Sequence, residues 1–227
     1  MKFKMKNFKL SFAGKVDTDY NQKSLTREFE YVHHFVNSKR MSNGNKKLHN
    51  MLVFDLPAIK SCPNCKSCKN TCYAIKQQVQ YPDTNVYRNT NLHMFLNEPK
   101  TLQMLIEKQL ISSKKEVIRL HGSGDFFSQE YINFWANIIM RFPNKKFYAY
   151  TKVENIFSFS NINKLQNFNL ITSFVGGKLN YGTLNYCETL KTRYNAFICP
   201  CGIDDSKKCG INCNYCITGK NVVFLIH

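Results

Sequence analysis

The stretch Glu116–Asp125, EVIRLHGSGD, places an apolar run directly before a loop that contains two glycines. The run at 116–120 predicts a buried strand, and the glycines predict a turn where the strand ends. The same order recurs in MLVFDLP (51–57), KFYAYTK (146–152) and FNLITSFVGG (168–177). Strands of this kind, separated by helical segments, pair in parallel through crossover connections. The sequence therefore predicts an α/β fold.

Helical periodicity fills the intervals between these strands. Helices are predicted over 84–97, 99–113, 153–166 and 183–194. Ser128 is the predicted N-cap of a further helix. The apolar face of that helix consists of Tyr131, Trp135, Ile138, Ile139 and Phe142.

The two ends of the chain extend this pattern. Alternation over the first dozen residues predicts a strand, and 24–38 predicts a helix, which together form a small N-terminal addition over 1–40. AFIC (196–199) and NVVFLIH (221–227) predict two more strands. We interpret 41–227 as a single α/β metal-binding domain, an incomplete (β/α) barrel-like parallel sheet with a cysteine-rich C-terminal segment.

Parallel sheets bind ligands at the carboxyl ends of their strands, so residues just after each predicted strand are the candidates for a site. The predicted catalytic residues are His121, Asp125 and Lys152. The predicted cofactor-binding residues are Gly122, Ser123, Gly124, Asp125 and Ser173. A loop histidine, a helix-capping aspartate, a solvated lysine and plain turns are the structural alternatives for the same residues.

Ten cysteines in 227 residues point to metal chemistry. No apolar run approaches the roughly 20 residues of a membrane span, and no secretory signal is visible, so we expect a cytoplasmic protein without a membrane partner. In a reducing cytoplasm, clustered cysteines bind metals or react more often than they form disulfides. Nine of the ten fall in two short stretches; the tenth, Cys187, is interpreted as a small buried hydrophobic residue.

The first cysteine stretch contains Cys62, Cys65, Cys68 and Cys72, and the second contains Cys199, Cys201, Cys209, Cys213 and Cys216. The first has the C-x2-C-x2-C-x3-C spacing of ferredoxin loops, which predicts a [4Fe–4S] cluster, with one or two clusters in the chain. Zinc is the alternative, since two pairs of thiolates can complete its tetrahedral shell. One composite cluster that draws on both stretches is a third possibility.

The net charge of +17, from 32 Lys and Arg against 15 Asp and Glu, favours a polyanionic partner. Nucleic acid is the commonest polyanion in the cytoplasm. A lysine-rich solvated surface that reflects codon bias accounts for the same total.

The chain resembles a family of bacteriophage proteins, the gene product eighty-eight-like proteins, over roughly 42–218. The resemblance rests on Gly44-Asn45 with Lys47, Asp55-Leu56-Pro57, Ser61-Cys62-Pro63, Cys68, Cys72-Tyr73-Ala74, HGSGDFFSQEY with Trp135, Tyr150-Thr151-Lys152, and Cys199-Pro200 with Cys209, Cys213 and Cys216. It implies a phage or prophage origin and a bacterial host cytoplasm. Cys65 and Cys201 are thiols beyond the family pattern.

The layout is also similar to that of radical S-adenosylmethionine (SAM) enzymes. In those enzymes a three-cysteine loop follows the first barrel strand, and a glycine-rich loop after the second strand holds the methionine amino group. Here the first cysteine stretch follows 51–57, and Gly122–Asp125 follows the next strand. The resemblance implies SAM as a possible cofactor, with Asp125 as an acceptor for its ammonium group.

Two functions follow from these features. The first is a radical-SAM-like iron–sulfur enzyme that acts on a nucleic acid or nucleotide. The second is a non-catalytic protein, stabilised by an iron–sulfur cluster or zinc, that binds nucleic acid or a polymerase.

Overall fold

The computed structural model describes residues 39–45, 48, 50–65, 68–153, 156–173, 179–182, 184–204 and 206–225, and only the backbone of 71, 179–182, 184–187, 202 and 225. These residues belong to one compact unit, Ser38–His227. The strand predicted for the first dozen residues and the helix predicted over 24–38 lie outside the described residues. The side chain of Cys187 does so as well.

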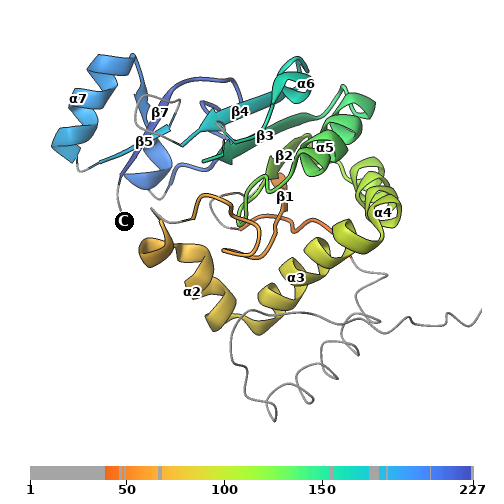
Figure 1. Ribbon diagram of the computed structural model, residues 1–227. Helices are drawn as coiled ribbons and strands as arrows, with labels where there is room; N and C mark the ends of the chain where they lie inside the picture. Colours follow the sequence, from red (N-terminus) through yellow and green to blue (C-terminus); the bar gives the residue numbers. More distant parts are fainter. Residues whose placement is uncertain are drawn as a thin grey trace, which may run out of the picture. The chain divides into compact units, whose positions relative to one another are not determined.

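A four-stranded parallel sheet forms the centre of this unit (Figure 1). Its strands, in spatial as well as chain order, are β1 (Met51–Phe54), β2 (Val117–Leu120), β3 (Lys146–Thr151) and β4 (Phe168–Thr172). Phe54 lies opposite Leu120, and Leu120 lies opposite Ala149, so the carboxyl ends of these strands meet at one edge. The predicted α/β fold with parallel strands is confirmed.

The α-helices in the described part of the chain are α2 (Tyr73–Gln80), α3 (Pro82–Asn97), α4 (Pro99–Ser112), α5 (Gln129–Arg141), α6 (Ser160–Asn163) and α7 (Leu184–Tyr194). Pro82 and Pro99 begin α3 and α4, where the missing N–H would have no intrahelical acceptor. Ser128 caps α5 as predicted, because its side chain accepts a hydrogen bond from the Tyr131 N–H at 3.2 Å.

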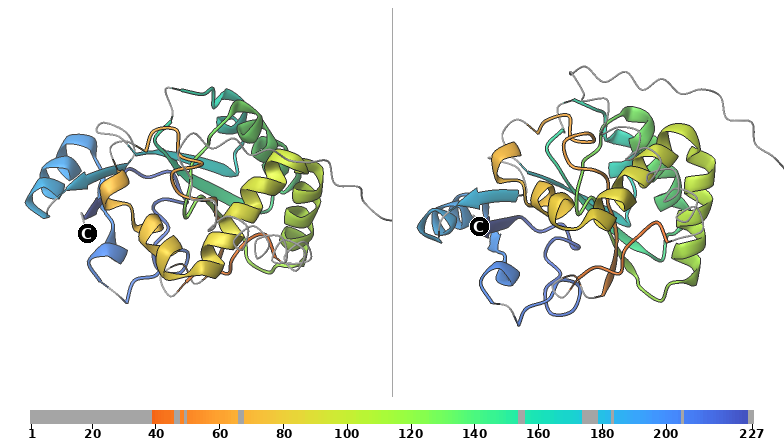
Figure 2. Two further views of the ribbon diagram at one scale, coloured as in Figure 1. Left: turned by 60° about the horizontal axis from the view of Figure 1, so that its bottom comes forward. Right: turned by 90° about the horizontal axis from the view of Figure 1, so that it is seen from below.

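The two faces of the sheet are covered by different parts of the chain. On one face, Phe54, Leu120 and Ala149 are fully buried against side chains of α3, α4 and α5 such as Trp135. The ring of Phe54 meets Trp135 edge to face at 5.0 Å. Figure 2 shows these helices side by side over the sheet.

The opposite face of the sheet carries the C-terminal cysteine-rich segment. Met51, Val53, Tyr148 and Ile171 form its core, and Cys209, Cys216, Ile217 and Phe224 pack against them. Alternation within each strand produces this division, since successive side chains point to opposite faces. The second cysteine stretch is thus held directly on the sheet.

A second sheet is separate from the first and contains β5 (Leu179–Gly182), β7 (Val222–Leu225) and β6 (Phe197–Ile198), in that order and all parallel. The strands predicted at 196–199 and 221–227 are therefore present as β6 and β7. They do not extend the central sheet, and no closed barrel is formed by the residues that the structure describes. The prediction of one barrel-like sheet is corrected to two open sheets.

Two helix predictions also differ from the structure. The helix predicted over 153–166 is reduced to α6, because Gln129 binds the backbone N–H and C=O of Ser158 (both 3.0 Å) and so holds this segment in a loop. Serine hydroxyls beside it bond locally, which competes with helix formation. Helix α2, directly after the first cysteine stretch, was not predicted.

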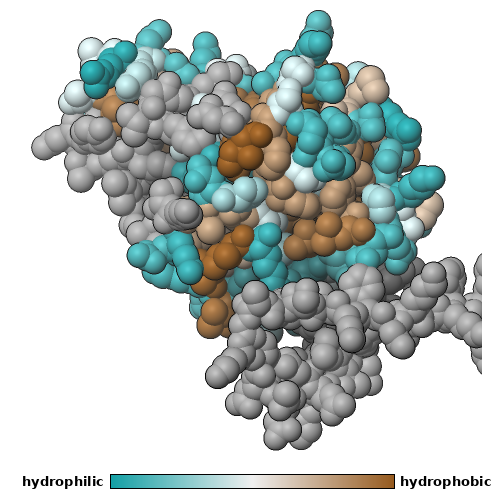
Figure 3. Space-filling model, in the orientation of Figure 1, coloured by the Kyte–Doolittle hydropathy of each residue, from teal (hydrophilic) through white to brown (hydrophobic). Residues whose placement is uncertain are grey.

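Apolar side chains also reach the surface of this unit. Val79, Leu96 and Ile111 are among the exposed large hydrophobic residues, and Figure 3 shows hydrophobic patches set among hydrophilic ones on one face. None of the described helices combines the length and the apolar character that crossing a bilayer requires.

Candidate functional site

The first cysteine loop starts where β1 ends and is tied to the carboxyl ends of β2 and β3. The Leu56 N–H donates to the Ser123 carbonyl and the Asp125 N–H donates to the Ser61 carbonyl, both at 2.9 Å. Asn64 Nδ2 donates to the Lys152 carbonyl at 2.8 Å. The predicted convergence of this loop with the loops after β2 and β3 is therefore present.

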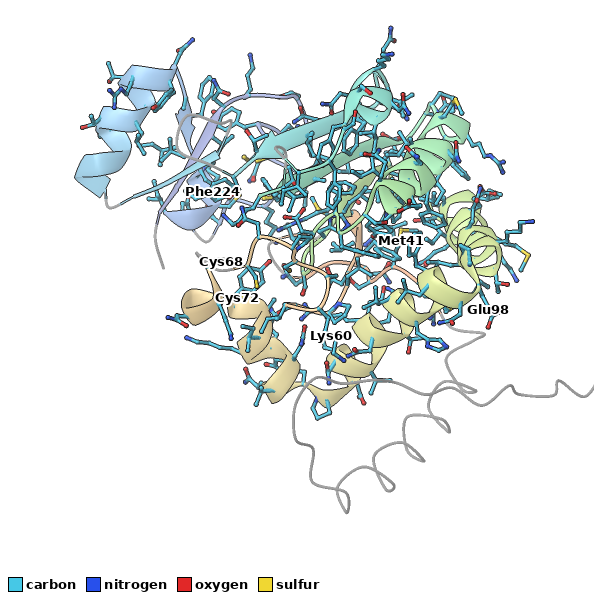
Figure 4. All side chains as sticks on the ribbon, viewed as in Figure 1. Met41, Lys60, Cys68, Cys72, Glu98 and Phe224 are labelled. Atoms are coloured by element: carbon cyan, nitrogen blue, oxygen red, sulfur yellow. The ribbon has the colours of Figure 1, made fainter. Side chains whose placement is uncertain are left out.

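The thiols of this loop lie near one another. Burial above all, with the nearby Asp125, Cys72 and Cys68, raises the pKa of Cys62 to about 12, against the lowering effect of a backbone hydrogen bond at Ile59. Burial also raises the pKa of Cys68, against the opposing effect of the Lys152 ammonium. Figure 4 shows Cys68 and Cys72 together at the beginning of α2. These thiols ionise readily only if a further positive charge, such as a metal, is close to them.

The second cysteine group is packed more tightly than the first. The Cys209 thiol donates to Cys201 Sγ at 3.4 Å, and Cys199 and Cys201 are buried beside Val222 of β7. Burial raises the pKa of Cys201 to about 12, with contributions from Cys209 and Cys213. The members of this packed group are Cys199, Cys201, Cys209, Cys213 and Cys216. All five predicted thiols of the second stretch are thus brought together, Cys201 included.

The cysteine thiols are of the right chemical type to bind a metal, but their positions do not form a metal site. By type, clustered thiols fit zinc or an iron–sulfur cluster. In the described part of the chain, however, no group of three or more His, Cys, Asp or Glu side chains is arranged to hold a metal ion. The sulfurs are neighbours without surrounding a common point, so metal binding would require them to shift. The grouping itself is fixed by packing and by backbone hydrogen bonds.

Asp125 is buried, and its carboxylate is occupied by its own chain. One oxygen accepts from the Phe126 N–H at 2.7 Å and from the Thr151 hydroxyl at 2.8 Å; the other accepts from the Lys152 N–H at 2.9 Å. Burial raises the pKa of Asp125 to about 6, although these hydrogen bonds lower it. The carboxylate therefore fastens the loop after β2 to the end of β3. Its predicted catalytic and ammonium-binding roles stay predictions.

Lys152 and Ser173 meet at the ends of β3 and β4. The Lys152 ammonium donates to the Ser173 hydroxyl at 2.7 Å and to the Ser173 carbonyl at 3.2 Å. Lys152 also lies close enough to Cys68 to influence its ionisation. The structure thus joins two predicted site residues to the first cysteine loop.

His121 is placed in the helix-covered core rather than among these polar groups. Its backbone has a left-handed φ of 63°, and its ring meets Phe126 edge to face at 4.5 Å. Nε2 shares a hydrogen bond of 3.0 Å with the Tyr131 hydroxyl. Burial, and then the charge of Arg119, lowers the pKa of His121 to about 3, so the imidazole is neutral at pH 7. No hydrogen bond joins it to Asp125 or to a thiol in the residues that the structure describes.

The glycines of the loop after β2 are required by close packing on β1. A Cβ on Gly122 would lie 2.5 Å from Asp55 Oδ1, and one on Gly124, where φ is +88°, would lie 2.6 Å from Leu56 Cβ and Ser61 Oγ. Ser123 is buried, and its hydroxyl has no hydrogen-bond partner among the described residues. The packing accounts for both glycines, and their cofactor-binding role stays a prediction.

Three charged residues of the site were not predicted. Asp55, after β1, accepts from the Ser123 N–H at 2.9 Å and pairs with Arg88 of α3 at 3.4 Å. Arg119 of β2 stacks on Tyr150, with its guanidinium carbon 4.9 Å from the ring centroid. A signal for Arg119 was present in the sequence, since it alternates with Ile118 and Leu120 and so must point away from their apolar face.

Residues 20–216 match the family model described as Gene product 88. The chain belongs to this family, as its motifs predicted. Two similar proteins, both called Gene 88 protein, come from Mycobacterium phages D29 and L5. They are 28% and 24% identical to this chain over 200 residues, and each match covers 72% of this chain and 81% of the phage protein. No solved structure matches the chain. These relatives support a bacteriophage origin.

Proposed function

We propose that this phage protein is a radical-SAM-like iron–sulfur enzyme that binds at least one [4Fe–4S] cluster through Cys62, Cys68 and Cys72. The observation that supports this proposal best is the position of the first cysteine loop. The loop follows β1 and lies against Asp125 and Lys152 at the carboxyl ends of the neighbouring strands. In parallel sheets this edge is where ligands bind.

The residues around the loop have separate tasks in this proposal. Cys62, Cys68 and Cys72 would hold the cluster, and a bound cluster would supply one-electron chemistry. Lys152, fixed by Ser173 at 2.7 Å, places a cation beside Cys68, where it favours the thiolate. Asp125 locks the loop after β2 to the end of β3 through two hydrogen bonds, from the Thr151 hydroxyl and the Lys152 N–H. SAM is the small ligand that we propose for this edge.

A second cluster is proposed for the C-terminal group. The five thiols there are packed on the sheet face opposite the helices. Four of them are enough for one cluster, and Cys201 contacts Cys209 directly. Zinc would be bound by the same donors, so metal analysis must separate the two.

A nucleic acid or nucleotide is the proposed substrate, on the strength of the net charge of +17. The corresponding measurement is retention of DNA or RNA as a function of salt, since each phosphate contact makes binding weaker as salt rises.

The test of the proposed function starts with iron, zinc and acid-labile sulfide content of the full chain purified without oxygen. We expect about four or eight iron atoms with matching sulfide and a broad absorption near ~400 nm. Separate Cys62→Ser, Cys68→Ser and Cys72→Ser variants should each lose about four iron atoms. The matched control is Cys65→Ser, which changes a thiol of the same loop and should keep them.

Two results would contradict the proposal. Zinc without sulfide would remove redox chemistry and favour the non-catalytic, metal-stabilised binding protein. Cluster-loaded protein that neither binds SAM in equilibrium dialysis nor cleaves it after reduction would remove the SAM part.

A further inference from the structure

Arg119 lies in the middle of the central sheet, on the face that carries the C-terminal cysteine group. Its guanidinium stacks on Tyr150 at 4.9 Å, and Tyr150 and Cys216 lie in each other's electrostatic environment. Arg119 is also within electrostatic reach of Cys216 and of Tyr73, the first residue of α2, next to Cys72. Arg119 therefore lies between the two cysteine groups.

The guanidinium of Arg119 has no polar partner among the described residues. Its Nε is buried without a hydrogen bond, and no ion pair or hydrogen bond reaches its other nitrogens in that part of the chain. A face-on tyrosine compensates only part of the hydration that a half-buried cation loses. The buried Nε–H, and the planar fork to which it belongs, therefore have no acceptor among the residues that the structure describes.

The carboxylate whose charge reaches Arg119, that of Asp55, is already engaged. Asp55 accepts from Arg88 at 3.4 Å and from the Ser123 N–H at 2.9 Å. Arg88 is itself buried and is held by the Gln77 side chain at 2.9 Å and the Ala74 carbonyl at 3.2 Å. The Asp55 carboxylate is therefore paired with Arg88, and it influences Arg119 only through space. Among the described residues, the positive charge of Arg119 has no ion-pair partner.

Arg119 is half-buried, and its Nε, which is buried without a hydrogen bond, costs stability. An apolar side chain of similar length would pack at the same place without that cost. The arrangement is therefore poor as scaffolding. A ligand that brings one negative charge and two oxygen acceptors would neutralise the charge of Arg119 and match the planar fork.

We propose that Arg119 binds a singly charged oxyanion, a carboxylate or a phosphodiester, of a ligand that lies between the two cysteine groups. This inference rests on the proposed function for the place of the ligand and adds the chemical class of the group that is recognised there. Arg119 is a binding residue in this proposal and takes no part in a covalent step.

The test is thermal unfolding of the full chain, purified without oxygen, in sodium acetate, sodium dimethyl phosphate or sodium chloride at equal ionic strength. An anion at about five times its Kd should raise the Tm by about 2–4 °C over chloride. Arg119→Met should abolish this rise and, in chloride, unfold at the same temperature as the wild-type protein or higher. A response to acetate alone identifies a carboxylate, and a response to dimethyl phosphate alone identifies a phosphodiester.

The matched control is Arg141→Met, which removes an exposed arginine that pairs with Glu107 at 3.2 Å. It should keep the full anion response, since its charge lies outside the site. The proposal is overturned if neither anion raises the wild-type Tm above chloride, if the rise persists in Arg119→Met, or if Arg119→Met is less stable than the wild-type protein in chloride.

Iron and sulfide are measured on the same samples. If the wild-type protein contains its full iron but shows no anion response, the proposal for Arg119 fails and the cluster proposal stands. If the cysteine variants lose iron and keep the anion response, anion binding at Arg119 does not depend on the cluster.

Discussion

Replacing His121 by phenylalanine should change how stability depends on pH, because His121 is buried beside Tyr131 and Phe126 and its pKa is lowered to about 3. In the unfolded chain the same imidazole takes up a proton below about pH 6.5. Between these values the unfolded state binds the extra proton, so the free energy of unfolding falls as the pH falls. From pH 7.5 to pH 5, this one group should cost the wild-type protein about 2 kcal/mol.

The phenylalanine variant loses this dependence but leaves the buried Tyr131 hydroxyl without the partner that lies 3.0 Å away. An unsatisfied buried hydroxyl costs about 1–2 kcal/mol. His121→Phe should therefore be less stable than the wild-type protein at pH 7.5 by about that amount. At pH 5 the two proteins should be equally stable, or the variant should be the more stable one.

The assay is urea denaturation of both proteins at half-unit steps from pH 5 to pH 7.5. The difference between them isolates His121, because all other titrating groups are common to both. His93→Gln, which replaces an exposed histidine of α3, is measured beside it as the matched histidine substitution. A difference for His121→Phe that stays constant with pH would refute the inference that the imidazole is buried and neutral.

Two further predictions concern the backbone around the site. Gly124→Ala should destabilise the protein by about 2–4 kcal/mol, since φ is +88° and the new Cβ would lie 2.6 Å from Leu56 Cβ and Ser61 Oγ. Gly210→Ala is the control: φ is also positive there, but the new Cβ would meet only the flexible end of Met51 at 3.3 Å. It should cost about 1 kcal/mol in the same urea titration, and equal losses at both positions would contradict this account. Ser128→Ala should cost about 1 kcal/mol by removing the N-cap of α5, while Ser128→Asp should retain most of that stability. An alanine variant as stable as the wild-type protein would show that the cap contributes nothing.

Local sequence signals predicted the elements whose stability is local. The apolar run 116–120 is β2, and Ser128 with the apolar face of Trp135 is the beginning of α5, because capping and periodicity act within a few residues. The prediction of a helix over 153–166 was wrong because a long-range contact overrides the local signal there. A contact from Gln129, distant in the sequence, holds Ser158 in a loop.

The site shows the same division. Spacing alone identified the nine clustered thiols, and strand order alone placed the first cysteine loop near Asp125 and Lys152. The sequence did not reveal that the Asp125 carboxylate accepts three hydrogen bonds from its own chain. Nor did it reveal that His121 lies in the aromatic core, with a φ of 63°. Those facts depend on which backbone N–H groups and rings surround each side chain.

The sequence by itself determined the parallel α/β class, the cap of α5 and the grouping of cysteines, since each follows from short-range periodicity or spacing. Only the tertiary structure decided that the C-terminal strands form a second sheet and that the C-terminal cysteine group covers one face of the central sheet. It also decided that Arg119 lies half-buried between the two cysteine groups, without an ion pair among the described residues. Charge balance in a buried site is a sum over residues far apart in the chain, so no local pattern contains it.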